Sequence, residues 1–232
     1  MTELVSYHLD DGVASIAMDD GKVNVLSPAM LAALDRSFDR AEADRAVVVL
    51  SGRADMFSAG FDLKVLRAGG QPAISMLKDG FSLAARILAF PRPVIVACPG
   101  HAVAMGVFLL LSGDYRIGVE GPYRIVANEV AIGLTMPRAA VEICRQRLTP
   151  AAFNRAVILA EIFPPEEALA AGFIDQLVPT GELPDAIDSA AATFKSLDAG
   201  AHASTKRRVR APLLAVLEGA SQADDDDLRS LV

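Results

Sequence analysis

Two short, unbroken apolar runs constrain the fold of this chain more than any other feature. Residues 46–50 and 94–97 are continuous and mostly β-branched, a pattern typical of strands that are buried on both faces of a sheet. Each run leads through a turn of small residues into a helical pattern, over residues 74–89 in the first case and 107–112 in the second. Repeated strand–turn–helix units predict an α/β core.

The N-terminal part adds a hairpin and a helix. Residues 4–9 and 13–18 are expected to form two strands, joined by a turn at residues 10–12. Ser27 is a suitable N-cap and Pro28 fits the first position of the helix that follows. The inward face of that helix is expected to carry four apolar residues at helical spacing: Leu31, Leu34, Phe38 and Ala41.

The later part of the chain is mainly helical, after a further expected strand at residues 115–119. Helices are predicted to begin at Thr149-Pro150 and at Pro164-Pro165, and Gly172 is expected to end one. We therefore divide the chain into a core of residues 1–178 and a helical C-terminal region of residues 179–232. The expected role of the second region is oligomerisation.

Composition and charge argue against several classes of protein. An apolar content of 52% in 232 residues favours one compact domain, and a net charge of −7 argues against a nucleic-acid partner. The longest apolar run, residues 102–111, is about half the length of a membrane span. The N-terminus lacks an export signal, so we expect a cytoplasmic protein with no membrane partner. Cys98 and Cys144 fit neither a disulfide framework nor a metal site.

Two charged stretches lie near the C-terminus. The first, Lys-Arg-Arg-Val-Arg at residues 206–210, is expected to be the solvated face of a late helix. The alternative is a contact for an anionic ligand, such as a nucleotide phosphate. The second, an acidic run at residues 224–227, is expected to be solvated.

Two segments are rich in small residues and directly follow buried strands, so their backbone N–H groups can form a ligand-binding pocket. Residues 57–64, Phe-Ser-Ala-Gly-Phe-Asp-Leu-Lys, follow the first buried strand, and residues 93–106 pass from the second strand through a tight turn into a helix start. Small side chains let the backbone approach a ligand, and free N–H groups at a helix start favour an anion. We expect the two turns to face one site. No G-x-G-x-x-G or G-x-x-x-x-G-K-[ST] motif is present to support a dinucleotide fold or a P-loop.

Four segments together resemble one family. Residues 57–64 resemble the F-x-A-G-x-D-[LI]-K motif of the crotonase (enoyl-CoA hydratase/isomerase) superfamily, and residues 93–106 resemble its K-P-V-I-A-A-V-N-G-x-A-x-G-G-G stretch. Residues 21–26 are similar to its P-x-x-x-N-A-L loop, and residues 163–175 resemble its A-x-x-x-G-[LI]-[VI]-D helix and turn. The resemblance covers residues 3 to 220, with the motifs in the family's order.

The resemblance implies an α/β fold, a crotonase-like spiral of ββα units with a helical C-terminal region, usually assembled as homotrimers or hexamers. It implies that the core binds an acyl-CoA thioester, with coenzyme A as part of the substrate and no metal or redox cofactor. Backbone N–H groups of Phe61 and of either Met105 or Gly106 would hold the thioester oxygen. The substrate-binding positions implied by the resemblance are Lys22, Asn24, Val25, Ala59, Gly60, Asp62, Leu63 and Phe108.

Two departures from the family pattern bear on the reaction. The family commonly has three consecutive glycines where this chain has Ala104-Met105-Gly106, so the bulk of Met105 is expected to narrow the acyl pocket. Hydratases of the family carry a glutamate three residues beyond the oxyanion glycine, and that position is Phe108 here. Their other glutamate falls on Glu129.

A single carboxylate favours isomerisation. Hydration must activate water and deliver a proton, which two carboxylates share, whereas moving a double bond from C3–C4 to C2–C3 needs one base. We therefore expect a Δ3,Δ2-enoyl-CoA isomerase in which an apolar pocket raises the pKa of Glu129. One alternative is an enoyl-CoA hydratase of fatty-acid β-oxidation, with Tyr123 or a held water in place of the second carboxylate. The other is a non-catalytic acyl-CoA binding protein.

Several of these residues also have purely structural interpretations. Glu129 can pair with Arg124 or Arg138 instead of acting on a substrate. Asp62 is expected to cap a helix, the alternative being a position near the adenine of CoA. His101 and Asp114 are expected to be structural.

Overall fold

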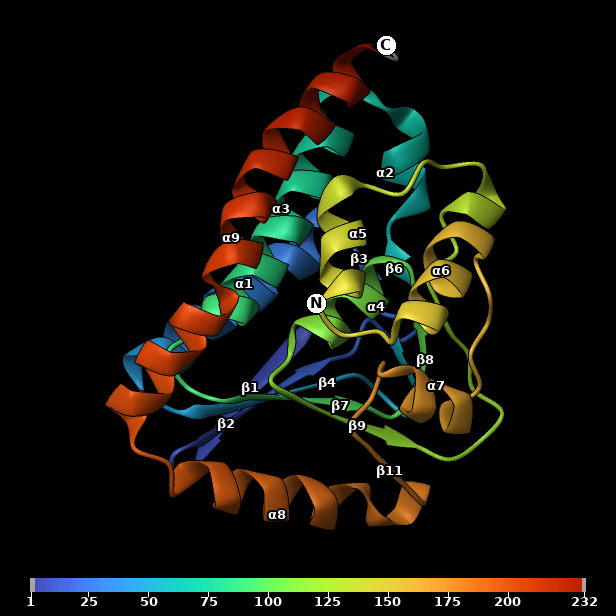
Figure 1. Ribbon diagram of the computed structural model, residues 1–232. Helices are drawn as coiled ribbons and strands as arrows, with labels where there is room; N and C mark the ends of the chain where they lie inside the picture. The colour runs from blue at the N-terminus through green and yellow to red at the C-terminus, as the bar shows by residue number, and fades with distance from the viewer. Residues whose placement is uncertain (1–2, 231–232) are drawn as a thin grey trace.

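The computed structural model describes residues 3–230, with side chains described as far as residue 220. A main sheet of six strands has the order β1-β2-β4-β7-β9-β11 (Figure 1). β1 and β2 form an antiparallel hairpin, and the strands from β2 onward are parallel. The strands of this sheet are β1 (Val5–Asp10), β2 (Val13–Met18), β4 (Val47–Ser51), β7 (Val94–Cys98), β9 (Tyr115–Val119) and β11 (Gln176–Val178).

Helices cover both faces of the main sheet. They are α1 (Pro28–Ala43), α2 (Leu63–Ala68), α3 (Gly70–Ala89), α4 (Met105–Ser112), α5 (Arg138–Arg145), α6 (Pro150–Leu159), α7 (Pro165–Ala171), α8 (Leu183–Lys195) and α9 (Ala199–Ser230), with short 3-10 turns at η1 (Val130–Ile132) and η2 (Thr180–Glu182). Figure 1 shows α8 on one side of the sheet and α1, α3, α4 and α5 on the other.

The two apolar runs are buried on both faces, as predicted. In β4, Val48 and Leu50 belong to the larger hydrophobic core, while Val47 and Val49 belong to a smaller core on the opposite face. α8 supplies Ala190 to that smaller core. Burial on two sides explains why the sequence of these strands is continuously apolar rather than alternating.

Three short strands form a second, parallel sheet with the order β10-β8-β5. These strands are β5 (Asp55–Ser58), β8 (Gly100–Val103) and β10 (Ile125–Val126), and nearby β3 (Val25–Leu26) pairs with β6 (Gly60–Phe61). Each of the three follows a strand of the main sheet and precedes one or more helices, with β6 inserted before the helices of the first unit, so units of paired strands and helix occur three times in succession. This repeat confirms the expected spiral of ββα units.

The N-terminal helix forms as its sequence predicts. Ser27 Oγ accepts a hydrogen bond from the Met30 amide at 3.2 Å, and Pro28 is the first residue of α1. The predicted inward face is buried throughout.

The C-terminal region combines confirmed and corrected predictions. α6 and α7 begin at the predicted prolines, and Gly172 ends α7 in the left-handed conformation, with φ of 95°. α9 packs along α3 and α5. The prediction that residues 206–210 form a solvated face is wrong for Lys206 and Arg210, which are buried against Asp114, and right for the exposed Arg207 and Arg208.

Two further predictions lie partly or wholly beyond what the structure tests. The side chains of residues 224–227 lie outside the described part of the chain. The division at residue 178 and the oligomerisation role of the last region stay predictions. Within residues 3–230, no helix combines the length and the apolar character that crossing a membrane requires.

Candidate active site

The two turns singled out in the sequence leave neighbouring strands of the small sheet at the same edge. β8 pairs with β5 on one side and with β10 on the other, and all three run in one direction. The Ala104 amide donates to the Val126 carbonyl oxygen at 2.9 Å, just beyond the paired residues. Because the carboxyl ends of parallel strands meet at one edge, three segments emerge side by side there: the Gly60–Phe61 strand, the start of α4, and the segment that carries Glu129.

Close packing brings the first two segments into contact. A Cβ atom at Gly106 would lie 2.6 Å from the Ser58 carbonyl oxygen. A Cβ atom at Gly60, where φ is 85°, would lie 2.9 Å from the Ala104 Cβ and 3.2 Å from the Met105 nitrogen. Only glycine fits at either position, so the small residues of the two motifs allow the two backbones to meet, as the sequence predicts.

The start of α4 presents free amides at this edge. Ala104 has φ of 51° and ψ of −124°, an unusual conformation for a residue with a side chain. Its carbonyl oxygen accepts from the amides of Val107 and Phe108 at 2.8 and 3.3 Å. Within the described residues, the amides of Met105 and Gly106 have no acceptor in the protein. Free amides at the positive end of a helix dipole favour a negatively charged oxygen.

Glu129 is a buried carboxylate that lacks a full set of partners. The residue is 7% exposed, and its Oε2 atom has no hydrogen-bond partner among the described residues. Burial raises the pKa of Glu129 to about 7, with a smaller opposing contribution from its own backbone amide. The pairing with Arg124 or Arg138 that the sequence left open therefore does not satisfy Oε2. An acid with this pKa can both accept and return a proton near neutral pH.

Glu129 has a buried thiol of α5 as a neighbour. The pKa of the Cys144 thiol on α5 is raised by burial and, to a smaller extent, by the charge of Glu129, which places the two residues close together. The neighbouring Asn128 Oδ1 is also buried without a partner in the described structure. Two adjacent unsatisfied acceptors are rare in a folded core and are typical of functional positions.

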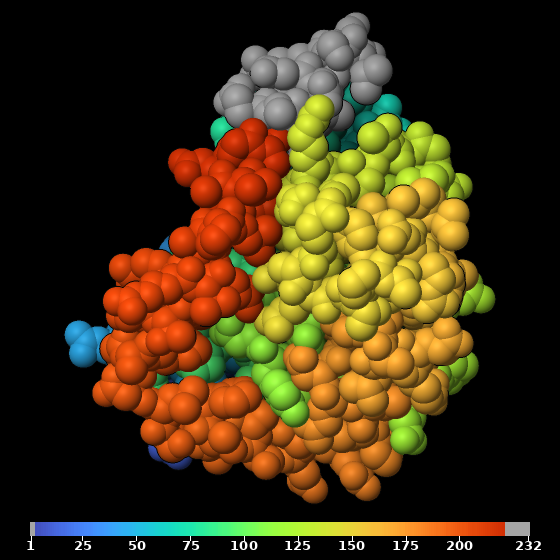
Figure 2. Space-filling view, in the orientation of Figure 1, coloured from blue at the N-terminus to red at the C-terminus, as the bar shows by residue number. Residues whose placement is uncertain are grey.

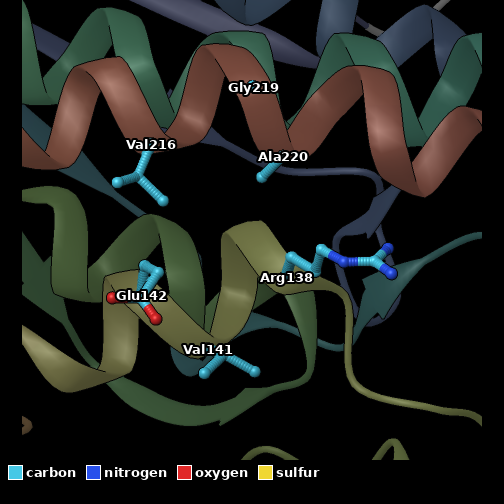
Figure 3. A pocket seen from close by; sticks show the side chains of 6 residues that line it. All are labelled: Arg138, Val141, Glu142, Val216, Gly219 and Ala220. Carbon is cyan, nitrogen blue, oxygen red and sulfur yellow. The ribbon is translucent and has the colours of Figure 1, made fainter.

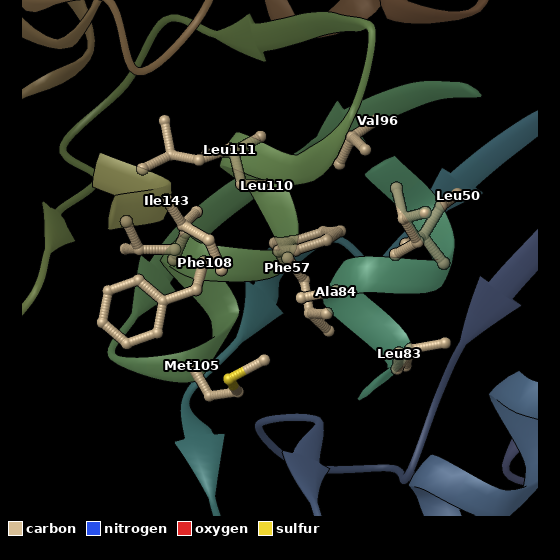
Figure 4. Packing of buried hydrophobic residues seen from close by; sticks show 14 of the residues in the cluster. Leu50, Phe57, Leu83, Ala84, Val96, Met105, Phe108, Leu110, Leu111 and Ile143 are labelled. Atoms are coloured by element: carbon tan, nitrogen blue, oxygen red, sulfur yellow. The ribbon is translucent and has the colours of Figure 1, made fainter. Parts of the chain in front are cut away.

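An aromatic cluster lines the same region. The rings of Phe81 and Phe108 stack with centroids 6.2 Å apart, and Phe61 meets Phe81 edge to face at 6.3 Å. Figure 4 shows Met105 and Phe108 near one another on α4, within the hydrophobic core. The residues whose amides are candidates for oxyanion binding, Phe61 and Met105, thus also supply apolar side chains beside them.

Gly80 on α3 makes room for this cluster. A Cβ atom at Gly80 would lie 2.4 Å from Cζ of Phe61 and 3.6 Å from Cε of Met105. Phe81, Leu83 and Ile87, also on α3, are all buried in the larger core.

Asn24 has a positioning role in the structure, and its expected contact with substrate stays a prediction. Its side chain is fully buried, and Nδ2 donates to the carbonyl oxygens of Met18 and Phe57 at 3.0 and 3.1 Å. Oδ1 accepts from the Asp20 amide at 3.0 Å. These bonds hold the loop of residues 21–26 against β5.

The other predicted binding residues lie on the two loops that flank the small sheet. Lys22 and Leu63 are exposed, and Val25 and Ala59 are half-buried. Asp62 caps α2 by accepting from the Lys64 amide at 2.9 Å, which confirms the structural interpretation of this residue. No observation tests contacts of these residues with a substrate.

His101 and Tyr123 lie at the other end of the small sheet. His101 Nδ1 accepts from the Arg124 amide at 3.0 Å, so this residue is structural, as expected. The Tyr123 hydroxyl donates to Asp55 Oδ1 at 2.6 Å. Asp55 begins β5 and Tyr123 precedes β10, whereas Glu129 follows β10. Tyr123 and Glu129 thus lie beyond opposite ends of β10, which disfavours Tyr123 as the replacement for a second carboxylate.

A cavity of about 420 Å³ lies between α5 and α9 (Figure 3). Its walls are formed by Arg138, Val141, Glu142, Val216, Gly219 and Ala220. Neither Glu129 nor the two turns contribute to it. Among the described residues, no cluster of His, Cys, Asp and Glu side chains has the arrangement of a metal site.

Sequence reasoning missed two features of the site. The positive φ of Ala104 could not be predicted from the sequence, because alanine does not favour positive φ. The buried Oδ1 of Asn128 was equally hidden. Polar residues such as Asn128 are common in loops, so the sequence gives no sign that this one is buried. Only the fold shows that its Oδ1 atom is enclosed.

Comparison with known proteins decides the family. The family described as "Enoyl-CoA hydratase/isomerase" matches residues 8–231. The human mitochondrial enoyl-CoA delta isomerase 1 is 31% identical over 235 residues, which cover 99% of this chain and 78% of the human protein. The chain belongs to the enoyl-CoA hydratase/isomerase family. It therefore has the crotonase fold and is an enzyme.

Solved structures of other members of the family are very similar to this one. An enoyl-CoA hydratase/isomerase family protein from Pseudomonas syringae has a TM-score of 0.96 and 50% identity, covering 97% of this chain and 98% of its own. A Mycobacterium tuberculosis enoyl-CoA isomerase has a TM-score of 0.92 and 48% identity, with coverage of 97% and 98%. The same mycobacterial protein is named a probable enoyl-CoA hydratase in another structure. The family is thus established, while the names of its members divide between two reactions.

Proposed function

We propose that this member of the enoyl-CoA hydratase/isomerase family is a Δ3,Δ2-enoyl-CoA isomerase, with Glu129 as its single acid and base. The observation that carries the proposal is one buried carboxylate, with its pKa raised to about 7, at the edge where free helix-start amides converge. The 31% identity with the human isomerase supports the same assignment.

The arrangement suits proton transfer beside a thioester. The Glu129 carboxylate takes a proton from C2 of a 3-enoyl-CoA, and the electron pair of that C–H bond moves toward the carbonyl, which gives a dienolate with negative charge on the thioester oxygen. When the carbonyl re-forms, the C2–C3 double bond is made, and the electrons of the former C3–C4 double bond take the proton back from Glu129 at C4. Negative charge that develops on the thioester oxygen is stabilised by the amide of Phe61 and that of Met105 or Gly106. Loss of one such donor typically costs about 3 kcal/mol in the barrier.

Phe108 is the residue that disfavours hydration. It is 1% exposed and stacked on Phe81, and it takes the position at which hydratases of the family carry a second glutamate. A hydrophobic ring can neither hold nor ionise a water molecule. The bulk of Phe108 and Met105 also restricts the space for an acyl chain, which favours substrates that are slender near C4.

Hydratase activity is the second candidate, because the mycobacterial protein with 47% identity is named a probable hydratase. With Tyr123 bonded to Asp55 at the far end of the small sheet, the remaining source of a second catalytic group is a water held by backbone. That requirement makes hydration the weaker assignment.

Self-association and a cytoplasmic location are parts of this proposal. Five exposed apolar side chains gather on η1, the segment after it and the end of α6, which are in contact: Val130, Ile132, Leu134, Ile158 and Leu159. An exposed apolar group of this kind is typical of a subunit interface. It supports the homotrimer or hexamer that the family resemblance implies, and light scattering on the purified protein measures that state.

A substrate panel tests the proposal. Purified enzyme is given 3-enoyl-CoA thioesters of several chain lengths and, separately, crotonyl-CoA. We expect the 3-enoyl substrates to become conjugated 2-enoyl-CoA, while crotonyl-CoA gains water at a rate far lower. Efficient formation of 3-hydroxyacyl-CoA would instead establish a hydratase. Tight binding of acyl-CoA with no turnover of any substrate would establish a non-catalytic protein.

A further inference from the structure

A second group of charged side chains lies apart from the candidate active site, around Asp114. It is assembled from the segments that enter β7 and β9, from the loop between α5 and α6, and from the first half of α9. Its cationic members are Arg92, Arg116, Arg147, Lys206 and Arg210. The basic run of residues 206–210 therefore contributes two inward-facing cations to a buried group.

Asp114 is the centre of this group. Its Oδ2 atom accepts from Lys206 Nζ at 2.5 Å and from the Val94 amide at 2.9 Å. Its Oδ1 atom lies 3.5 Å from Arg210 Nη2. The Asp114 carboxylate thus interacts with two buried cations and with the amide that begins β7. Few of its acceptor sites remain for the other cations of the group.

The remaining carboxylate is committed to a different arginine. Asp175 binds the Arg116 guanidinium through two hydrogen bonds of 2.5 and 2.8 Å. Arg147 is near enough to Arg116 and Arg210 to experience the positive charge of both. It finds carbonyl oxygens rather than a carboxylate, with Nη2 donating to Gly113 at 2.6 Å.

The group is short of negative charge. Five cations, with Arg92 included because its charge acts on the neighbouring His202, lie around two carboxylates, Asp114 and Asp175, a formal excess of three positive charges (5 − 2) within the described residues. Lys206 and Arg210 are only 7% and 8% exposed. Several buried donors have no partner in the described structure: Arg92 Nε, Arg147 Nε, Arg210 Nη1 and, if protonated at that nitrogen, His202 Nε2. Buried charges are normally paired, so this group lacks an anion.

Electrostatics is consistent with this shortage. Burial is the largest cause that lowers the pKa of Lys206, Arg210 and Arg147, the last to about 10; Asp114 opposes this by raising all three, and the neighbouring cations lower them further. The pKa of His202 is lowered as well, chiefly by burial, with Lys206 and Arg92 contributing. An anion placed among these groups would relieve the repulsion.

We propose that this cluster is a binding site for a small oxyanion of the inorganic phosphate class. Guanidinium groups offer paired N–H donors that match phosphate oxygens, and a lysine adds a point charge. Arg210 and Arg147, each with an unpartnered nitrogen, are the principal contacts, and Lys206 supplies additional charge. Figure 2 shows the surface hollowed between the first half of α9 and α8, with the green central part of the chain at its floor.

This anion site is separate from the place where a thioester would react. Val94 begins β7, and Asp114 immediately precedes β9, so the cluster lies at the amino ends of these strands. The free amides of α4 and Glu129 follow the carboxyl ends of β8 and β10. Along the chain, strands β7 and β8 therefore lie between the cluster at Val94 and the free amides at the start of α4.

Calorimetric titration of the full-length protein with inorganic phosphate tests the proposal, at constant ionic strength set with chloride. We expect saturable phosphate binding, weakened about tenfold or more in Arg210→Gln and in Arg147→Gln, since each loses charge-assisted hydrogen bonds. Arg207→Gln is the matched control, because it removes the same charge from an exposed position on the same helix. It is expected to bind phosphate as the wild type does.

Three results would overturn the proposal. The first is the absence of saturable phosphate binding by the wild-type protein, a measurement that does not depend on any variant folding. The second is an equal loss of affinity in Arg207→Gln and Arg210→Gln, which would indicate a diffuse electrostatic effect. The third is displacement of phosphate by CoA, since a site separate from the thioester pocket is expected to retain phosphate when CoA is added.

Discussion

Two buried carboxylates of this enzyme, Glu129 and Asp114, occupy opposite surroundings. Glu129 lies close to the buried thiol of Cys144 with its Oε2 unpartnered in the described structure, and burial raises its pKa to about 7. Asp114 binds a lysine, an arginine and a backbone amide. The difference shows that partners, more than burial, decide what a carboxylate does. An isolated acid can exchange a proton, while a fully bonded acid organises structure.

The largest expected effect concerns the isolated acid. Glu129→Gln removes the proton carrier and keeps the shape of the side chain, so we expect kcat for isomerisation to fall about 10³-fold or more. Steady-state kinetics with a 3-enoyl-CoA measures the loss, and circular dichroism verifies the fold. Glu142→Gln, which alters a carboxylate paired with Arg145 on α5, is the control and should retain activity. A fully active Glu129→Gln variant would show that Glu129 is not the proton carrier and would remove the functional difference between the two acids.

The next effect concerns the bonded acid. Asp114→Asn leaves Lys206 and Arg210 buried without their counter-ion, so we expect the free energy of unfolding to fall by about 3–5 kcal/mol. Urea denaturation measures the change. Asp39→Asn, at an exposed ion pair with Arg86, is expected to cost no more than about 1 kcal/mol. Similar losses in the two variants would contradict the structural role of Asp114.

The pH dependence of stability sharpens the comparison further. Because the folded protein holds a proton on Glu129 at higher pH than the unfolded chain does, stability from this group is complete below pH 4.5 and is lost as the pH rises through about 7. Glu129→Gln does not ionise. Its free energy of unfolding, relative to wild type, is expected to rise by up to about 3 kcal/mol over that interval. Denaturation series at several pH values measure it, and a difference independent of pH would mean that the acid ionises freely.

The smallest effect concerns the contact that builds the site. Gly106→Ala places a methyl group 2.6 Å from the Ser58 carbonyl oxygen, so the start of α4 must move away from the first turn. We expect a loss of about 1–3 kcal/mol in stability and a lower kcat. Gly219→Ala on α9, where no atom lies within 4 Å of an added Cβ, is the matched control and should keep both. Unchanged kinetics in Gly106→Ala would show that the approach of the two turns is not required.

Much of the fold was predictable from the sequence, because two-sided burial leaves a strong pattern. β4, β7 and α1 follow directly from continuous apolar runs, a capping serine and helical spacing. The small sheet was not predicted, since β5, β8 and β10 are only two to four residues long and contain residues typical of turns. Their pairing depends on main-sheet strands that are distant in sequence.

The candidate site was predictable in its parts and not in all its roles. The glycines mark where the backbones approach each other, and Glu129 is found where the family resemblance places an acid. The burial of Asn24 and the remoteness of Tyr123 could not be foreseen, because both depend on which end of the small sheet a loop occupies. The same holds for residues 206–210, where helical rotation alone decides which cations face Asp114.

The most direct test of the central claim follows a proton from C2 to C4. A 3-enoyl-CoA carrying deuterium on C2 is converted by the enzyme in ordinary water, and the product is examined by mass spectrometry and NMR. If the shielded Glu129 alone carries the proton, part of the deuterium is found on C4 of the 2-enoyl-CoA. The absence of deuterium from C4 at all stages of the reaction would contradict transfer by a single enclosed carboxylate.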